Sequence, residues 1–262
     1  EGRVMVFDFV RRMRKDRPFM VRTLKQYVFI YEALFEMFFA GDTLVDFDLK
    51  DKYHSWTQKN PQSGRSYLRD QYQLLENFTR QPRKEEFKTA MLKVNINKNR
   101  YKDVLAPEKY RPLLRSLGGP ASTDYINALF LDGYLTKNQF IITQTPLKST
   151  IIDFWKLVYD YDVCTIVTVE NFKNEDNTCV EYWSNTTPKQ FDPFFIETTI
   201  AYQHDNITLR SFKVFNNQHP KKPPKSVMQF QFNAWSQPNL TPQSKTMTMD
   251  LIDNVFAWQD KA

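Results

Sequence analysis

The sequence predicts an α/β (α+β) fold, in which a twisted mixed β-sheet is flanked by helices. Residues 97–169 contain strand-like runs, then a helix-like run, then a strand-like run without a polar face. The helix-like run, residues 149–159, carries apolar side chains at helical spacing (Ile151, Ile152, Phe154, Trp155 and Val158). Residues 163–169 are apolar on both alternating faces apart from threonines, which predicts a strand covered on two sides.

The first 40 residues predict two helices. An apolar stripe (Val6, Phe9, Val10 and Met13) lies opposite a basic face, and Arg17-Pro18 ends the pattern. Thr23 and Gln26 are spaced as a capping box at the start of the second helix. The basic face suits either a lipid or nucleic-acid patch or a solvated helix surface, and we favour the solvated surface.

The middle of the chain predicts a linker followed by helices. Residues 48–64 are polar, residues 66–78 form a helical pattern capped by Ser66, and residues 83–92 suggest a second short helix. Turn signals at residues 118–120 (GGP) and 132–133 (DG) separate the strand-like runs that follow.

The last third predicts strands and a final helix. Residues 194–202, 207–214 and 228–234 alternate with period two. In the last run Gln229, Gln231 and Asn233 form the polar side of a half-buried strand. Residues 246–258 predict a helix, with four side chains facing inward (Met249, Ile252, Val255 and Phe256).

Composition limits the class of protein. The chain has 262 residues, is 41% apolar and 15% aromatic, and has a net charge of +6. This charge suits anionic partners such as phosphopeptides, nucleic acid or a membrane face, or reflects ordinary solvated lysines. The two cysteines, Cys164 and Cys179, are expected to be free thiols. The three histidines show no metal-ligand spacing with them, so we expect neither a metal nor another cofactor.

Four ordered motifs resemble those of protein-tyrosine phosphatase domains. They are KNRY from Lys98, DYINA from Asp124, FIITQTP from Phe140 and DFW from Asp153. The resemblance implies a fold of that family, incomplete here. It also implies that Tyr101 stacks on the phosphotyrosine ring and that Asp103 holds the substrate backbone. The alternative for Tyr101 is a packed side chain without that role.

The N-terminal segment resembles the closing helices of the same family. Its motif reads MVRTLKQY from Met20. In active members the first glutamine of this motif positions the hydrolytic water. Arg22 stands at that position, and a guanidinium only donates hydrogen bonds, which argues against the role. Gln26 matches the second glutamine.

The order of these motifs implies a tandem receptor-type phosphatase. Residues 1–40 would be the C-terminal helices of a first phosphatase domain, and residues 41–65 a linker. Residues 66–262 would be the N-terminal part of a second domain, truncated before the catalytic loop. Residues 235–245 resemble the distal domain of the MAM-containing kappa, mu and rho group. The resemblance implies the cytoplasmic face of the plasma membrane, with membrane attachment only through a segment absent here.

The residues for phosphotyrosine hydrolysis are missing from the chain. The chemistry needs a cysteine thiolate, an arginine six positions later and a general acid. Glu170 and Asn185 stand six positions after the two cysteines. Gln237 stands at the aspartate position of the family's Trp-Pro-Asp loop, and a neutral amide cannot act as the acid.

Three functions follow from these observations. The first is a regulatory, non-catalytic domain that binds phosphotyrosine proteins or the neighbouring phosphatase domain. The second is an active cysteinyl-phosphate phosphatase whose catalytic loop lies outside this fragment. The third, a basic nucleic-acid module, has no recognised motif, so we expect no nucleic-acid partner.

Overall fold

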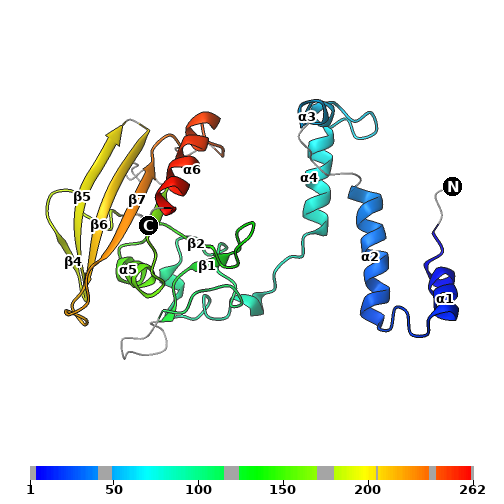
Figure 1. The fold of residues 1–262 in the computed structure, drawn as a ribbon, viewed down its shortest axis with the longest axis horizontal. Helices are drawn as coiled ribbons and strands as arrows, with labels where there is room; N and C mark the ends of the chain where they lie inside the picture. The colour runs from blue at the N-terminus through cyan, green and yellow to red at the C-terminus, as the bar shows by residue number, and fades with distance from the viewer. Residues whose placement is uncertain are drawn as a thin grey trace. The chain divides into compact units, whose positions relative to one another are not determined.

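A computed structural model describes residues 4–40, 49–114, 124–169, 180–204, 206–235 and 240–260. The chain divides into two compact units, residues 1–82 and 83–262 (Figure 1). Several positions named above lie outside the described residues: the turn at 118–120, Cys179 and Gln237. Among the described residues, no helix has both the length and the apolar character needed to span a membrane.

The N-terminal unit consists of helices α1 (Val6–Asp16), α2 (Leu24–Ala40), α3 (Leu49–Thr57) and α4 (Tyr67–Phe78). The predicted capping box is present: the Thr23 backbone N–H donates to Gln26 Oε1 at 3.1 Å, and the Gln26 N–H donates to Thr23 Oγ1 at 3.2 Å. Ser66 caps α4, since its hydroxyl accepts from the Arg69 N–H. These contacts satisfy backbone donors that have no partner within the helix.

Two features of this unit differ from the sequence-based expectation. Helix α3 lies inside the range 41–65 that was expected to be a linker because of its polar composition. Asp51 in the first turn favours a helix here, since a carboxylate interacts well with the positive end of the helix dipole. In α1 the predicted stripe is buried only at Val6 and Val10, whereas Phe9 is 57% exposed.

The C-terminal unit contains two sheets. Strands β1 (Ala128–Leu131) and β2 (Phe140–Thr143) form an antiparallel pair. They are joined by the loop of residues 132–139, so Asp132-Gly133 begins this loop and does not form a two-residue turn by itself. The second sheet has the order β3-β7-β6-β5-β4. Its strands are β3 (Thr165–Thr168), β4 (Lys189–Phe191), β5 (Phe194–His204), β6 (Ile207–Asn216) and β7 (Lys225–Phe232). Because β3 is parallel to β7 while the other pairs are antiparallel, the sheet is mixed, as predicted.

Helix α5 (Ile151–Asp160) and helix α6 (Lys245–Gln259) cover opposite faces of the five-stranded sheet. Val227 belongs to the cluster that contains α5 residues, whereas Phe230 and Phe232 belong to the cluster that contains Leu251 of α6. Since successive residues of a strand point to opposite faces, the even-numbered side of β7 faces α6 and the odd-numbered side faces α5.

After α4 in the chain, the helix expected at residues 83–92 is present only as a short 3₁₀ turn. This turn is η1 (Lys84–Phe87), and a second one, η2 (Ile96–Lys98), precedes the first motif. The Arg83 N–H donates to Glu86 Oε1 at 2.9 Å, which closes the start of η1. The remainder of the segment is held by turns rather than by a continuous helical ladder.

Three expectations about burial in this unit are wrong. Val167 and Val169 are 48% and 49% exposed, because β3 is the edge of its sheet and only its α5 face is covered. Of the four α6 side chains predicted to face inward, Val255 does pack against the cluster that contains Leu251, whereas Met249 is 56% exposed, so the inward face is rotated from the predicted one. Finally, β7 is not half-buried: its glutamines lie in the interior (Gln229 and Gln231, 0% and 8% exposed).

Candidate functional site

The four sequence motifs meet around the side chain of Gln144, which follows β2. Gln144 Oε1 accepts from the Arg100 N–H at 2.9 Å, and its Nε2 donates to the Lys98 carbonyl at 2.8 Å. Asn127 Nδ2 donates to the Val104 carbonyl at 2.8 Å and lies 3.3 Å from Gln144 Oε1. One amide therefore clamps the backbone on both sides of Asn99 and fixes the segment that carries Tyr101.

A partly buried ion pair connects the same segment to α5. Lys98 Nζ lies 2.9 Å from Asp153 Oδ2 and donates to the Tyr125 carbonyl at 3.3 Å. Burial raises the pKa of the Asp153 carboxyl, and the hydrogen bond and charge of Lys98 offset part of that rise. The first residue of the DFW motif thus serves as an anchor for the first residue of the KNRY motif.

The side chains of Asn99 and Tyr125 support the segment that carries Tyr101 through hydrogen bonds. The Tyr125 hydroxyl donates to Asn99 Oδ1 at 2.6 Å, and Asn99 Nδ2 donates to the Ala90 and Asn95 carbonyls at 3.2 Å. Tyr125 is fully buried, and this burial raises its pKa to about 12. The phenol therefore stays protonated and remains a hydrogen-bond donor across the physiological pH range.

The two predicted substrate-binding residues project from this scaffold. The Tyr101 side chain is 49% exposed, and the Arg100 guanidinium carbon lies 5.4 Å from the centre of its ring. Asp103 is exposed two residues later. The Tyr101 ring is thus half accessible beside a cation, rather than packed in the core.

The other predicted site residues lie elsewhere. Arg22 and Gln26 belong to the N-terminal unit, where Arg22 is exposed and the Gln26 side chain accepts the capping hydrogen bond at the start of α2. Gln237 lies outside the described residues, and Trp235 packs against the cluster under α6. Cys164 is a free thiol whose Sγ lies 3.5 Å from Thr165 Oγ1.

A buried polar cluster lies in the five-stranded sheet, on the face that α5 covers. Arg210 Nη1 donates to Gln229 Oε1 at 3.1 Å and to Gln231 Oε1 at 2.6 Å. Its Nε donates to Asn185 Oδ1 at 2.9 Å, and its guanidinium lies 4.7 Å from the ring centre of Trp183. Burial lowers the pKa of Arg210, and the neighbouring acid and phenol partly oppose that effect.

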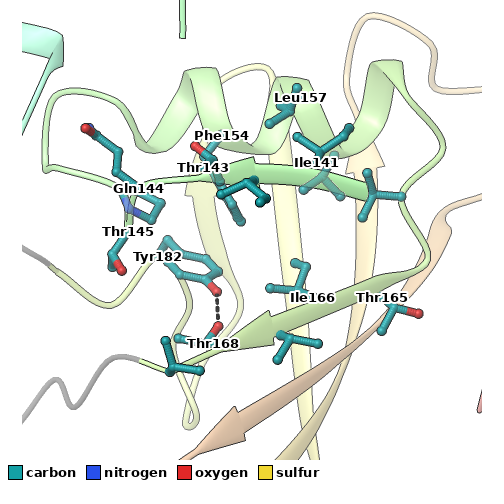
Figure 2. A pocket seen from close by; sticks show the side chains of 16 residues that line it. Ile141, Thr143, Gln144, Thr145, Phe154, Leu157, Thr165, Ile166, Thr168 and Tyr182 are labelled. Atoms are coloured by element: carbon teal, nitrogen blue, oxygen red, sulfur yellow. Dashed lines mark hydrogen bonds between the residues drawn. The ribbon is translucent and has the colours of Figure 1, made fainter. Parts of the chain in front are cut away.

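Tyr182 links this cluster to β3. Its hydroxyl accepts from Gln229 Nε2 at 2.8 Å and lies 3.1 Å from Thr168 Oγ1 (Figure 2). Burial raises the pKa of Tyr182 to about 12. Sequence patterns could not predict this cluster beyond the polar positions of β7, because alternation alone assigns such positions to solvent.

A cavity of about 330 Å³ lies between β2 and β3, next to the scaffold of Tyr101. Figure 2 shows Ile141 and Thr143 on one side, Ile166 and Thr168 on the other. Gln144 stands at the end of β2, where the cavity meets the clamp described above. Within the described residues, no group of three or more acidic, histidine or cysteine side chains is arranged to hold a metal ion.

Comparison with known proteins decides the family. A family model described as protein-tyrosine phosphatase matches residues 1–36 and 95–262, which is most of the chain. The chain belongs to the protein-tyrosine phosphatase family. The matched ranges include all four motifs of the scaffold around Gln144 and the strands of the five-stranded sheet.

Three proteins similar to this phosphatase family member are named receptor-type tyrosine-protein phosphatases. The chain is 34% identical to the chicken receptor-type tyrosine-protein phosphatase U over all of its length, and 35% identical to the human epsilon type. It is 30% identical to the human alpha type over 94% of its length. The chain spans only 18%, 38% and 30% of these three relatives.

A solved structure has the same phosphatase fold. It is the catalytic domain of human protein tyrosine phosphatase non-receptor type 18, matched with a TM-score of 0.57 and 30% identity. The match covers 64% of this chain and 60% of that catalytic domain. The mixed sheet with helices on both faces is therefore the phosphatase fold that the motifs implied.

Proposed function

We propose that this chain is part of a receptor-type protein-tyrosine phosphatase whose distal domain recognises phosphotyrosine without hydrolysing it. The observation that carries the proposal is a hydrogen-bonded scaffold that presents a half-exposed Tyr101, in a chain that lacks the groups for hydrolysis. Gln237 replaces the general acid, and neither cysteine is followed six positions later by arginine. Its partners are phosphotyrosine proteins or the neighbouring phosphatase domain.

The domain organisation belongs to the same proposal. Residues 1–40 close a first phosphatase domain, residues 41–65 connect the domains, and residues 66–262 begin the second. The two separate ranges matched by the family model support this arrangement. The ending WSQPNLTP from Trp235 supports membership of the kappa, mu and rho group. Relatives named receptor-type support a position at the cytoplasmic face of the plasma membrane.

Peptide binding tests recognition, and the chain supplies a matched control. Tyr110 resembles Tyr101 in exposure, 47% against 49%, and also has a cation over its ring, with Lys109 Nζ at 4.9 Å. We expect Tyr101→Ala to weaken binding of a fluorescent phosphotyrosine peptide about fivefold, because ring stacking contributes roughly 1 kcal/mol. Tyr110→Ala should leave binding unchanged. Equal loss in both variants, or equal binding of the unphosphorylated peptide, would refute recognition at Tyr101.

Hydrolysis of p-nitrophenyl phosphate tests the second half of the proposal. We expect no turnover by the 262-residue chain above the rate of a double variant in which Cys164 and Cys179 are alanine. Turnover that either substitution abolishes would identify that cysteine as a nucleophile.

The alternative function is an active phosphatase with its catalytic loop outside this chain. In the protein expressed from its complete coding sequence, Gln237→Asp should raise kcat, because a general acid contributes ~10²–10⁴-fold. High activity without that substitution would favour the alternative, and no gain with it would show that the position does not supply the acid.

A further inference from the structure

Another cavity, of about 520 Å³, lies at the end of the five-stranded sheet where β5 and β7 begin and β6 ends. Phe194 pairs with Asn216 and Val214 pairs with Lys225, so these strand ends lie side by side. The last turns of α5 and the loop between β6 and β7 complete the lining, and Figure 1 shows both elements. Because β3 is parallel to β7, Thr168 lies toward the opposite end of the sheet, and the cavity shares no lining residue with the one between β2 and β3.

The lining of this cavity includes a buried ammonium group. Lys156 is only 4% exposed, yet among the residues that the structure describes its Nζ makes no hydrogen bond or ion pair. Burial lowers the pKa of Lys156, and the carboxylates of Asp160 and Asp153, about one turn away on either side in α5, oppose that effect only in part. A buried cation without hydrogen bonds is unfavourable, so an acceptor inside the cavity would stabilise it.

Further hydrogen-bond donors line the same cavity. Asn216 at the end of β6 is 9% exposed, and its Oδ1 accepts from the Gln218 N–H at 2.9 Å, which leaves its Nδ2 as a donor. Lys222 and His219 line the cavity from the exposed loop between β6 and β7. Donors from α5, β6 and this loop therefore line one volume, an arrangement that suits a phosphate group, which lysines bind as point charges.

Other groups in the lining suit a ligand that carries hydroxyl groups. Asp160 and Asp162 line the cavity, and carboxylates accept hydrogen bonds from hydroxyls. One oxygen of Asp162 already accepts from Lys225 Nζ, so this acid is held in place. The rings of Tyr159 and Phe194 add an apolar surface, against which the carbon atoms of a sugar or cyclic polyol can pack.

We propose that this cavity is a binding site for a phosphorylated sugar or cyclic polyol. The phosphate accepts hydrogen bonds from Lys156, Asn216 and Lys222, and the hydroxyl groups donate to Asp160 and Asp162. Three lysines against two aspartates give the lining a net positive charge, which favours an anion over a neutral sugar. The volume lies in the range of small-molecule sites, about 300–1,000 Å³. The site is independent of the phosphotyrosine recognition proposed above.

Isothermal titration calorimetry of the 262-residue chain with myo-inositol monophosphate tests the site. We expect saturable binding that Lys156→Met weakens about tenfold or more, because the variant removes a buried charged donor and keeps a similar side-chain volume. Lys213→Met is the matched control, since it removes the same charge from an exposed position on β6 outside the cavity, and it should leave binding unchanged. No binding at millimolar concentrations, unchanged binding in Lys156→Met, or an equal loss in both variants would overturn the proposal.

Thermal unfolding separates lost binding from lost folding. Without ligand, the Tm of Lys156→Met should be no lower than that of the wild type, because exchanging a buried charge for an apolar side chain of similar volume is neutral or stabilising. If this variant nevertheless unfolds, Lys222→Met changes only an exposed side chain and should weaken binding about threefold or more. Unchanged binding in that second variant would then overturn the proposal.

Comparison of ligands tests which parts are recognised and where they come from. Inorganic phosphate should bind about tenfold more weakly than myo-inositol monophosphate, and equal binding of the two would overturn recognition of the polyol. Co-sedimentation with vesicles that contain a phosphatidylinositol monophosphate, abolished by Lys156→Met, would identify a lipid headgroup as the source. Calorimetric binding without co-sedimentation would identify a free ligand. Tyr101→Ala should bind myo-inositol monophosphate as the wild type does, so a failure here is separate from a failure of phosphotyrosine recognition.

Discussion

Glu108 is a carboxylate whose contacts make the stability of the C-terminal unit depend on pH. Its Oε1 accepts from the Thr89 N–H at 2.5 Å, and its Oε2 accepts from Arg111 Nε at 3.0 Å. Partial burial raises the pKa of Glu108, but these donors outweigh it, so the pKa lies below the ordinary value of 4.5. Hydrogen bonds thus connect residues 89, 108 and 111 and stabilise the segment that leads to β1.

The direction of this shift predicts a pH dependence. Because the folded pKa is depressed, the stabilisation is fully present above pH 4.5 and is lost as the pH falls through the lower folded pKa. At pH 7, Glu108→Gln should reduce the free energy of unfolding of the C-terminal unit by about 1–2 kcal/mol. Urea unfolding at several pH values should show this difference shrinking below pH 4.5. A difference that stays constant down to pH 3 would show that the stabilisation does not depend on the ionisation of Glu108.

Helix α6 offers a test at the scale of an element. The helical pattern predicted Met249 inward, whereas the structure buries Leu251 at 7% exposure and leaves Met249 56% exposed. We expect Leu251→Ala to reduce the free energy of unfolding by about 2–3 kcal/mol, because it empties a site between Phe230 and Phe232. Met249→Ala should change it by less than about 0.5 kcal/mol. Chemical denaturation of both variants decides between the two faces.

The elements that the sequence predicted well are those with a local signal. Ser66 and Thr23 cap their helices where the spacing placed them, and Asp132-Gly133 begins the loop that joins β1 to β2. The predictions that failed depend on the tertiary neighbours. Val167 is exposed because nothing in the described chain covers that face of β3, and Gln229 is buried because an arginine from the next strand reaches it.

The candidate site was predictable in the same uneven way. Motif resemblance located Tyr101 and Asp103, but not the side chains that hold them. Gln144 forms hydrogen bonds to the backbone of Arg100 and of Lys98, which precede it by 44 and 46 residues. Lys98 pairs with Asp153 across a similar separation in the chain. No local pattern encodes such contacts, because each partner alone is compatible with an ordinary surface position.

At the scale of the whole molecule, we expect the C-terminal unit to fold without the N-terminal unit. Both apolar clusters are made only of residues from Leu114 onward, and Trp155 and Trp183 lie at the centre of the first. A protein comprising residues 83–262 should therefore keep the near-ultraviolet circular dichroism of these tryptophans and unfold cooperatively. Loss of that signal on removal of residues 1–82 would show that the clusters need the N-terminal unit.

The Arg210 cluster also decides which alignment of β6 and β7 can form. In the native register Arg210 stands opposite Gln229, and Thr208 stands opposite Gln231. A slip of one residue would turn both glutamines toward Leu251 and Trp258 and bring a phenylalanine or a methionine opposite the guanidinium. A slip of two would keep the faces but place either Gln229 opposite Phe212 or Val227 opposite Arg210. Each misalignment sets a buried amide or the buried guanidinium opposite an apolar side chain, so the Arg210 cluster favours a single register.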